Sequence, residues 1–185
     1  MHIALIGATG FVGTALLNEL LQRGHRVTAL AVRGVDAVAS AYNPGWTHPD
    51  LHDEFLRGSR AITAGVKAAG VQRLLVVGGA GSLYVAPGVQ LVDTPQFPAE
   101  WKNGALAARE ALNLLRQEST LQWTFLSPAI LLEPGERTGH YRLGTESPLM
   151  NGDQPGKISV ADLAVAIVDE LEAPRHLQQR FTVAY

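Results

Sequence analysis

The sequence predicts a doubly wound α/β protein, with a parallel sheet covered by helices on both faces, in one domain spanning residues 1–185. Short apolar runs alternate along the chain with longer stretches in which apolar residues recur at helical spacing. A glycine-rich turn joins the first such pair. The chain has 185 residues, of which 46% are hydrophobic and 17% charged, and this suffices for one core.

The predicted elements follow from periodicity and from residues that end helices. Gly24 and Gly70 each stand where a helical pattern stops. Ser159-Val160-Ala161-Asp162 resembles a capping box and marks the start of the last helix. A stretch rich in glycine and proline, residues 128–156, is predicted to be a loop. The predicted strands are 2–6, 26–32, 36–41, 73–77, 122–126 and 181–184, and the predicted helices are 10–23, 52–69, 99–117 and 159–171.

One connection does not fit this pattern. Only residues 32–35 separate the second strand from the third apolar run. Parallel neighbours need a crossover of about a dozen residues or more. Either the chain lacks a helix–strand–helix unit near residues 33–35, or the printed sequence omits a stretch there, and we favour the second interpretation.

The strongest motif is Gly7-Ala8-Thr9-Gly10-Phe11-Val12-Gly13, directly after the first strand and at the start of the first helix. Gly7 and Gly10 permit a tight turn that brings backbone N–H groups close to a pyrophosphate. The helix start supplies further donors and a partial positive charge, and Gly13 allows close packing of helix on strand. The motif predicts a dinucleotide-binding site.

Arg33 adds a preference between cofactors. It stands 20 residues after Gly13, near the end of the predicted second strand. An arginine at this place suits the 2′-phosphate of NADP, whereas an acidic residue would bind the ribose hydroxyl of NAD. The sequence therefore favours NADP(H), with NAD(H) as the other option.

Three segments resemble the atypical short-chain dehydrogenase/reductases: the glycine motif of residues 7–13, Val76-Val77-Gly78-Gly79-Ala80-Gly81-Ser82-Leu83, and Ile158-Ser159-Val160-Ala161-Asp162-Leu163-Ala164. The branch they resemble is that of the NmrA-like, NAD(P)-binding NADH-flavin reductases, which are similar to biliverdin reductase B. The resemblance implies a Rossmann-type fold with NAD(P) across the carboxyl ends of the strands.

The same resemblance implies where the cofactor would lie. Ser40 and Ala41 would line the adenosine side. Gly78, Gly79 and Ser82 would border the nicotinamide end, together with Pro128 and Ala129.

The chain departs from the family in its catalytic residues. Typical short-chain dehydrogenases use Tyr-x-x-x-Lys to protonate a carbonyl. The equivalent helix begins Trp101-Lys102-Asn103-Gly104-Ala105, and none of the four tyrosines has a lysine four residues later. Ketone reduction and sugar epimerisation are therefore disfavoured.

Reduction of a flavin, quinone or similar planar acceptor does not require the Tyr–Lys pair. In such a reaction the cofactor carries the chemistry, and the protein holds the two reactants in position. Ser82 is the candidate catalytic hydroxyl, although it could instead cap local backbone. The candidates for an aromatic wall around the substrate are Tyr42, Trp46, Tyr84, Trp101 and Tyr141, of which Tyr42, Tyr84 and Trp101 are selected as substrate-binding residues. These aromatic residues could instead close the core. The alternatives are a non-catalytic NAD(P)-binding redox sensor of NmrA type and an NAD-dependent epimerase or dehydratase.

Composition limits the other partners. A net charge of −2 gives no basic surface for nucleic acid, and no apolar run is long enough to cross a membrane. The absence of cysteine excludes thiolate catalysis and is compatible with the cytoplasm, where we expect the protein. His48 and His52 are four residues apart, but Pro49 between them favours a surface loop over a metal site. We expect a small-molecule substrate, while the oligomeric state stays open.

Overall fold

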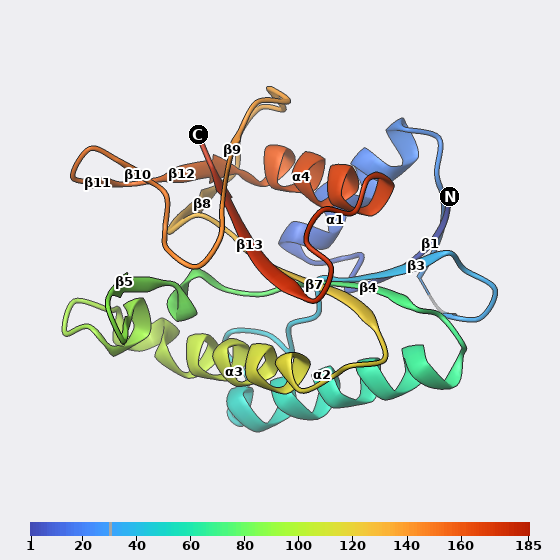
Figure 1. Ribbon diagram of the computed structural model, residues 1–185, viewed down its shortest axis with the longest axis horizontal. Helices are drawn as coiled ribbons and strands as arrows, with labels where there is room; N and C mark the ends of the chain where they lie inside the picture. The colour runs from blue at the N-terminus through green and yellow to red at the C-terminus, as the bar shows by residue number, and fades with distance from the viewer. Residues whose placement is uncertain (30) are drawn as a thin grey trace.

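The computed structural model of the chain describes residues 1–29 and 31–185. Its centre is a seven-stranded sheet with the order β2-β1-β3-β4-β7-β13-β9 (Figure 1). All neighbours are parallel except β9, which pairs antiparallel with β13. The strands of this sheet are β1 (His2–Ile6), β2 (Arg26–Thr28), β3 (Ala37–Ser40), β4 (Arg73–Val77), β7 (Gln122–Ser127), β9 (Arg142–Gly144) and β13 (Gln179–Ala184).

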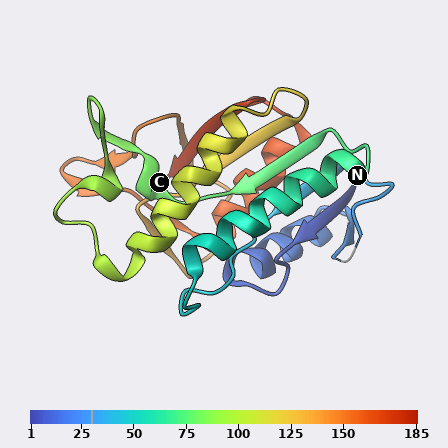
Figure 2. The ribbon, with the colours of Figure 1, turned by 90° about the horizontal axis from the view of Figure 1, so that it is seen from below.

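Four helices cover the sheet, two on each face. Figure 1 shows α1 (Phe11–Gln22) and α4 (Val160–Glu172) on one side, and α2 (Leu51–Ala68) and α3 (Ala99–Arg116) on the other. Figure 2 shows α2 and α3 running side by side across the strands. The doubly wound parallel fold is thereby confirmed, with helix bounds within one or two residues of the predicted ones.

The chain reverses its winding direction between β1 and β3. From β1 it passes through α1 to β2 on one side, whereas from β3 it proceeds through α2, β4 and α3 to β7 on the other. Ligands of open parallel sheets bind at such a switch point, outside the carboxyl ends of the strands. This position is therefore the first place to look for a site.

Both β2 and β3 pair in parallel with β1, one on each side, so the chain after β2 must return to the edge of the sheet where β3 starts. The described residues between the two strands contain no helix. β2 ends at Thr28, earlier than predicted, and Leu30 within the predicted strand lies outside the described residues. The described residues 31–36 turn at Gly34 and reach the start of β1, where Asp36 N–H donates to the His2 carbonyl oxygen (2.8 Å).

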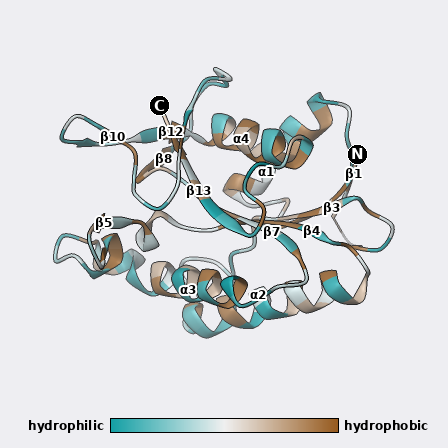
Figure 3. Cartoon of the chain, viewed as in Figure 1, coloured by the Kyte–Doolittle hydropathy of each residue, from teal (hydrophilic) through white to brown (hydrophobic). Residues whose placement is uncertain are grey.

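The apolar core lies on both faces of the sheet. On one face α1 and α4 pack against β1, β3 and β13 through residues such as Leu16, Ile167 and Phe181. On the other face α3 packs Leu112 and Leu115 against Phe125 of β7. Figure 3 shows the central strands in the hydrophobic range between helices of mixed colour, as expected for strands buried on both faces.

The stretch 128–156, predicted to be a loop, contains short strands. β8 (Leu131–Glu133) pairs in parallel with β12 (Lys157–Ser159), and β10 (Met150–Asn151) pairs with β11 (Gln154–Pro155). A further hairpin, β5 (Tyr84–Ala86) and β6 (Val89–Gln90), lies between two short 3-10 helices, η1 (Ala80–Ser82) and η2 (Leu91–Asp93). Among the helices of the described residues, none is long and apolar enough to cross a membrane.

Candidate functional site

Four adjacent parallel strands bring the predicted binding segments to one edge of the sheet. The glycine turn follows β1, Ser40 and Ala41 end β3, Gly78 and Gly79 follow β4, and Pro128 and Ala129 follow β7. The carboxyl ends of parallel strands meet at the same edge, so segments from four parts of the sequence form one rim.

The glycine turn depends on the absence of side chains at two positions. Gly7 has φ +81°, and a Cβ there would lie 2.5 Å from the Ala41 carbonyl oxygen. A Cβ on Gly13 would lie 1.9 Å from the Gly7 carbonyl oxygen. Gly10 N–H donates to that same oxygen at 3.1 Å. The turn is therefore packed between α1 and the end of β3, in a form that other residues would not permit.

The amino end of α1 is open to solvent. Thr9, Gly10 and Phe11 are exposed, and no side chain in the described part of the chain caps this end. The first turn of α1 holds no acidic residue. Thr14 N–H makes the first helical bond, to Gly10 O (2.9 Å), so the N–H groups of Phe11 and Val12 in the first turn are available to an acceptor from outside. This is an environment that favours an anion.

The rim continues across β3, β4 and β7. The backbone of Ala41 touches Gly7, and Gly78 N–H donates to the Leu126 carbonyl oxygen at 2.8 Å. A Cβ on Gly78 would meet the Phe125 ring at 1.9 Å, so this strand end also requires glycine. Pro128 and Ala129 lie just beyond the end of β7 and are buried.

Arg33 lies away from this rim. It is an exposed residue beside Gly34, whose carbonyl oxygen is 3.0 Å from Nδ1 of His2 at the start of β1. Gly7 is five residues further along that strand, or about 16 Å away at the rise of a strand. The structure does not bring Arg33 to the glycine turn, because β2 stops at Thr28 and the chain turns back to the opposite edge.

Ser82 is fixed by a buried arginine. Its Oγ accepts a hydrogen bond from Arg180 of β13 at 2.9 Å, and Arg180 also pairs with Glu146. Burial raises the pKa of Glu146, but hydrogen bonding to Arg180 and the charges of Arg180 and Arg116 outweigh this and lower the pKa. Only 2% of Ser82 is exposed, so its contact with a substrate stays a prediction; its observed part is to hold η1 against β13.

Buried polar atoms without partners surround this arginine. Within residues 1–29 and 31–185, Arg180 Nε, Ser127 Oγ and Thr182 Oγ1 have no hydrogen-bond partner. Ser127 and Thr182 are paired across β7 and β13, and Arg180 lies two residues earlier on the same face. The sequence analysis did not select Arg180 or Glu146, because Arg180 lies just before the predicted strand 181–184, whereas the observed strand begins at Gln179.

The predicted aromatic wall is not assembled as one surface. Tyr42 packs on Gly58 of α2, and its hydroxyl donates to the Glu54 carbonyl oxygen at 3.2 Å. Tyr84 lies in β5 and lines a hollow with Arg109 of α3. Trp101 alone of the three is largely exposed, in the first turn of α3.

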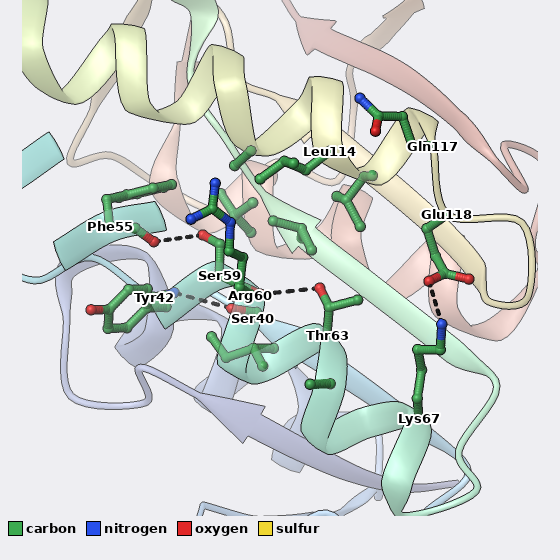
Figure 4. A pocket seen from close by; sticks show the side chains of 16 residues that line it. Ser40, Tyr42, Phe55, Ser59, Arg60, Thr63, Lys67, Leu114, Gln117 and Glu118 are labelled. Carbon is green, nitrogen blue, oxygen red and sulfur yellow. Dashed lines mark hydrogen bonds and ion pairs between the residues drawn. The ribbon is translucent and has the colours of Figure 1, made fainter. Parts of the chain in front are cut away.

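An apolar groove of about 290 Å³ runs between α2 and α3 (Figure 4). Ser40 lies at one end, whereas Lys67 and Glu118 form an ion pair of 2.7 Å at the other. Ser59 and Thr63 donate their hydroxyls to backbone oxygens of α2 and so present no free proton to the groove. At the rim the groove is lined by Ser40, Tyr42 and Val77, the last residue of β4.

No candidate metal centre emerges from the histidine pair. His52 lies 3.0 Å from Asp53 at the surface of α2. In the part of the chain that the structure describes, no three His, Asp or Glu side chains are grouped so that they could hold a metal ion.

Comparisons with known proteins identify the family of the chain. Residues 29–174 match the model of a family described as NAD(P)H-binding. Protein YwnB of Bacillus subtilis (strain 168) is 40% identical over 213 residues, which cover 99% of this chain and 98% of the relative. That alignment is longer than this chain, so the relative carries residues with no counterpart here.

Two solved structures are similar over their whole length. One, from Bacteroides thetaiotaomicron and provisionally described as an epimerase, is 42% identical with a TM-score of 0.90, covering 100% of this chain and 96% of that one. The other, from Streptococcus pneumoniae TIGR4 and provisionally described as an NADH-flavin reductase, is 37% identical with a TM-score of 0.89, covering 100% and 99%. The chain therefore belongs to the NAD(P)H-binding family, with an atypical short-chain dehydrogenase/reductase fold.

Proposed function

We propose that the protein is an NAD(P)H-dependent reductase of a small planar acceptor, such as a flavin or a quinone. The observation that carries the proposal is the open amino end of α1 beside the glycine turn. Its backbone donors face solvent without a capping side chain from the described residues, at the switch point of the sheet.

The residues present fit a dinucleotide. Gly7 and Gly13 let the turn pack tightly on the end of β3 and on itself, and the exposed backbone at Thr9 and Gly10 can approach a pyrophosphate closely. Ala41 after β3 and Gly78 after β4 extend the rim from the glycine turn in one direction, toward β7. These residues would bind and orient the dinucleotide. Pro128 and Ala129, which are buried, would close the nicotinamide end of the site.

The chemistry required of the protein is modest. Bound NAD(P)H would supply a hydride, that is two electrons and one proton, to the acceptor, and solvent would supply the second proton. α3 contains no tyrosine, so this helix cannot supply the Tyr–Lys pair that carbonyl chemistry needs. This favours an acceptor that needs no such acid over an epimerase or ketone substrate.

The choice between NADPH and NADH stays a prediction. Arg33 favoured NADPH from the sequence, but it lies at the far edge of the sheet and gives the 2′-phosphate no partner there. We therefore propose that either nucleotide binds. A cytoplasmic location likewise stays a prediction.

Two measurements test the proposed function. Calorimetry with NADPH and with NADH measures binding, and the loss of nucleotide absorbance after addition of FMN, riboflavin or a quinone measures turnover. We expect micromolar binding and acceptor-dependent oxidation. Binding without oxidation of either nucleotide would favour the redox sensor, and no binding at millimolar concentration would overturn the whole proposal.

A further inference from the structure

The apolar stripe of α3 continues beyond the core that it covers. Trp101, Ala105, Ala108, Leu112 and Leu115 recur at intervals of four and three, on one face of the helix. The last four are at most 9% exposed, whereas Trp101 is 54% exposed. The first member of the stripe therefore projects past the sheet, with much of its indole ring in solvent.

A second indole is held beside it. Trp46 belongs to the loop between β3 and α2, and its ring lies on Gly104 of α3. A Cβ on Gly104 would be 2.6 Å from Cζ3 of Trp46, so glycine is what admits the ring. Gly104 is buried, yet Trp46 is 60% exposed. One edge of the indole ring therefore packs on α3, and the rest of the side chain is exposed to solvent.

The face of α3 that carries Trp101 contacts the segment expected at the nicotinamide end. A Cβ on Gly79 would be 3.7 Å from Cβ of Ala108, and one on Gly81 would be 2.8 Å from Cβ of Ala105. The segment from Gly79 to Ser82 thus runs along the α3 stripe toward the amino end of the helix. The next position on the stripe in that direction is Trp101. Figure 2 shows the starts of α2 and α3 toward the same end of the molecule.

We propose that Trp46 and Trp101 form the surface on which the planar acceptor stacks, so that the acceptor ring lies between these indoles and the nicotinamide end. This inference rests on the proposed function, which it deepens by assigning the acceptor site. Two exposed indoles, one of them seated on a glycine, match a flat aromatic ring better than an aliphatic or sugar substrate. The contact of α3 with the segment from Gly79 to Ser82 argues for the reactant rather than for a protein partner.

Fluorescence offers a test that does not require turnover. The chain has three tryptophans, and the third, Trp123, is 3% exposed with its Nε1 donating to the Glu118 carbonyl oxygen. Riboflavin or menadione titrated into the nucleotide-free protein should quench the emission in a saturable way. In the double variant Trp46→Phe/Trp101→Phe, the remaining Trp123 emission should show only the non-saturable loss that absorption by the ligand causes.

Steady-state kinetics give a second readout. Trp46→Ala should raise the KM for riboflavin or menadione about tenfold, consistent with the ~1–3 kcal/mol that one stacked aromatic ring contributes. The Kd for the nucleotide should change less than about twofold. Gly104→Ala keeps both indoles but should displace Trp46, raising KM in the same direction. Leu143→Ala, an exposed apolar residue of β9, is the matched control and should change neither constant.

The outcomes separate this inference from the proposed function. If nucleotide binding and turnover occur but the indole variants keep the wild-type quenching and KM, the stacking surface is wrong and the function stands. If quenching is saturable and indole-dependent but no nucleotide binds, the surface stands and the function is wrong. If acceptors do not quench and the variants instead convert a dimer to a monomer on gel filtration, a second copy covers the indoles and the inference is overturned.

Discussion

The helices α1 and α4 lie side by side on the same face of the sheet, but their amino ends are built differently. At α4, Ser159 Oγ accepts from Asp162 N–H at 3.0 Å, and Asp162 supplies an acidic group in the first turn. At α1 the cap position is Gly10, and the described residues provide neither a capping side chain nor an acid in the first turn. One helix start is satisfied by its own residues, and the other is left open.

The contrast separates stability from binding. The carboxylate of Asp162 is buried and also accepts from Thr138 N–H (2.9 Å), Gly139 N–H (2.7 Å) and the Tyr185 hydroxyl (2.6 Å). It therefore ties the segment after β8 and the last residue of the chain to α4. The start of α1 makes no comparable ties, which is the arrangement expected where an external anion completes the helix.

The largest effect is expected from Gly13→Ala. A Cβ at this position would lie 1.9 Å from the Gly7 carbonyl oxygen, so the turn must shift. Overpacking of this kind costs about 1–3 kcal/mol in the free energy of unfolding. We also expect nucleotide binding to weaken by ~100-fold or more, corresponding to roughly 2.7 kcal/mol. Urea denaturation and calorimetry measure the two quantities.

Two variants control this result. A Cβ on Gly65, within α2, meets nothing within 4 Å, so Gly65→Ala should leave both quantities unchanged or raise stability slightly. Gly10→Ala places its Cβ 3.5 Å from Gly7 O, an ordinary contact, and should fold normally while binding the nucleotide less tightly. Normal nucleotide binding by Gly13→Ala would show that the turn is not the phosphate site.

The next effect concerns Asp162, whose pKa reflects its hydrogen bonds. Burial raises this pKa, but the bonds from Thr138, Tyr185 and Gly139 outweigh burial and lower it below its usual value. A lowered folded-state pKa stabilises the fold above the unfolded value of about 3.9, and that contribution is lost as pH falls through the folded value. Asp162→Asn should therefore cost about 1–3 kcal/mol near pH 7.

The pH dependence distinguishes charge from packing in this variant. The difference in unfolding free energy between the wild type and Asp162→Asn should be constant from pH 5 to 8 and shrink below about pH 4. Nucleotide affinity at pH 7 should be unaffected, because Asp162 serves α4. A difference that persists at low pH would mean that shape rather than the carboxylate matters.

A smaller effect is expected from Ser159→Ala. Loss of an N-cap hydroxyl costs about 1 kcal/mol, and Ser159 also donates to the Glu136 carbonyl oxygen at 2.8 Å. The expected result is a lower melting temperature with an unchanged Kd for NADPH. If nucleotide affinity fell in parallel, the two helix starts would be coupled, contrary to the separation argued above.

Local signals in the sequence predicted the elements and the rim, but not the contacts between distant segments. The apolar runs predicted β1 and β4 with their observed bounds, and the capping box predicted the start of α4. The pairing of β8 with β12 joins segments about 25 residues apart, and no local pattern encodes it. The hydrogen bond from Arg180 to Ser82 joins residues 98 positions apart, so hydrophobic periodicity does not predict it either. Trp46 and Gly104 likewise meet only through the fold.

The position of Arg33 depends on where the second strand ends, and the sequence predicted that end too late. Substitution of Arg33 is expected to have the smallest effect. The sequence placed Arg33 at the end of a long second strand, beside the cofactor, but that strand ends at Thr28 and the chain returns to His2. Because Arg33 is exposed at the opposite edge, Arg33→Ala should leave the ratio of NADPH to NADH affinity within about twofold, or ~0.4 kcal/mol. Calorimetry with both nucleotides measures this ratio. A tenfold loss for NADPH alone would place Arg33 at the 2′-phosphate after all, and would require the connection after β2 to run along the carboxyl edge of the sheet.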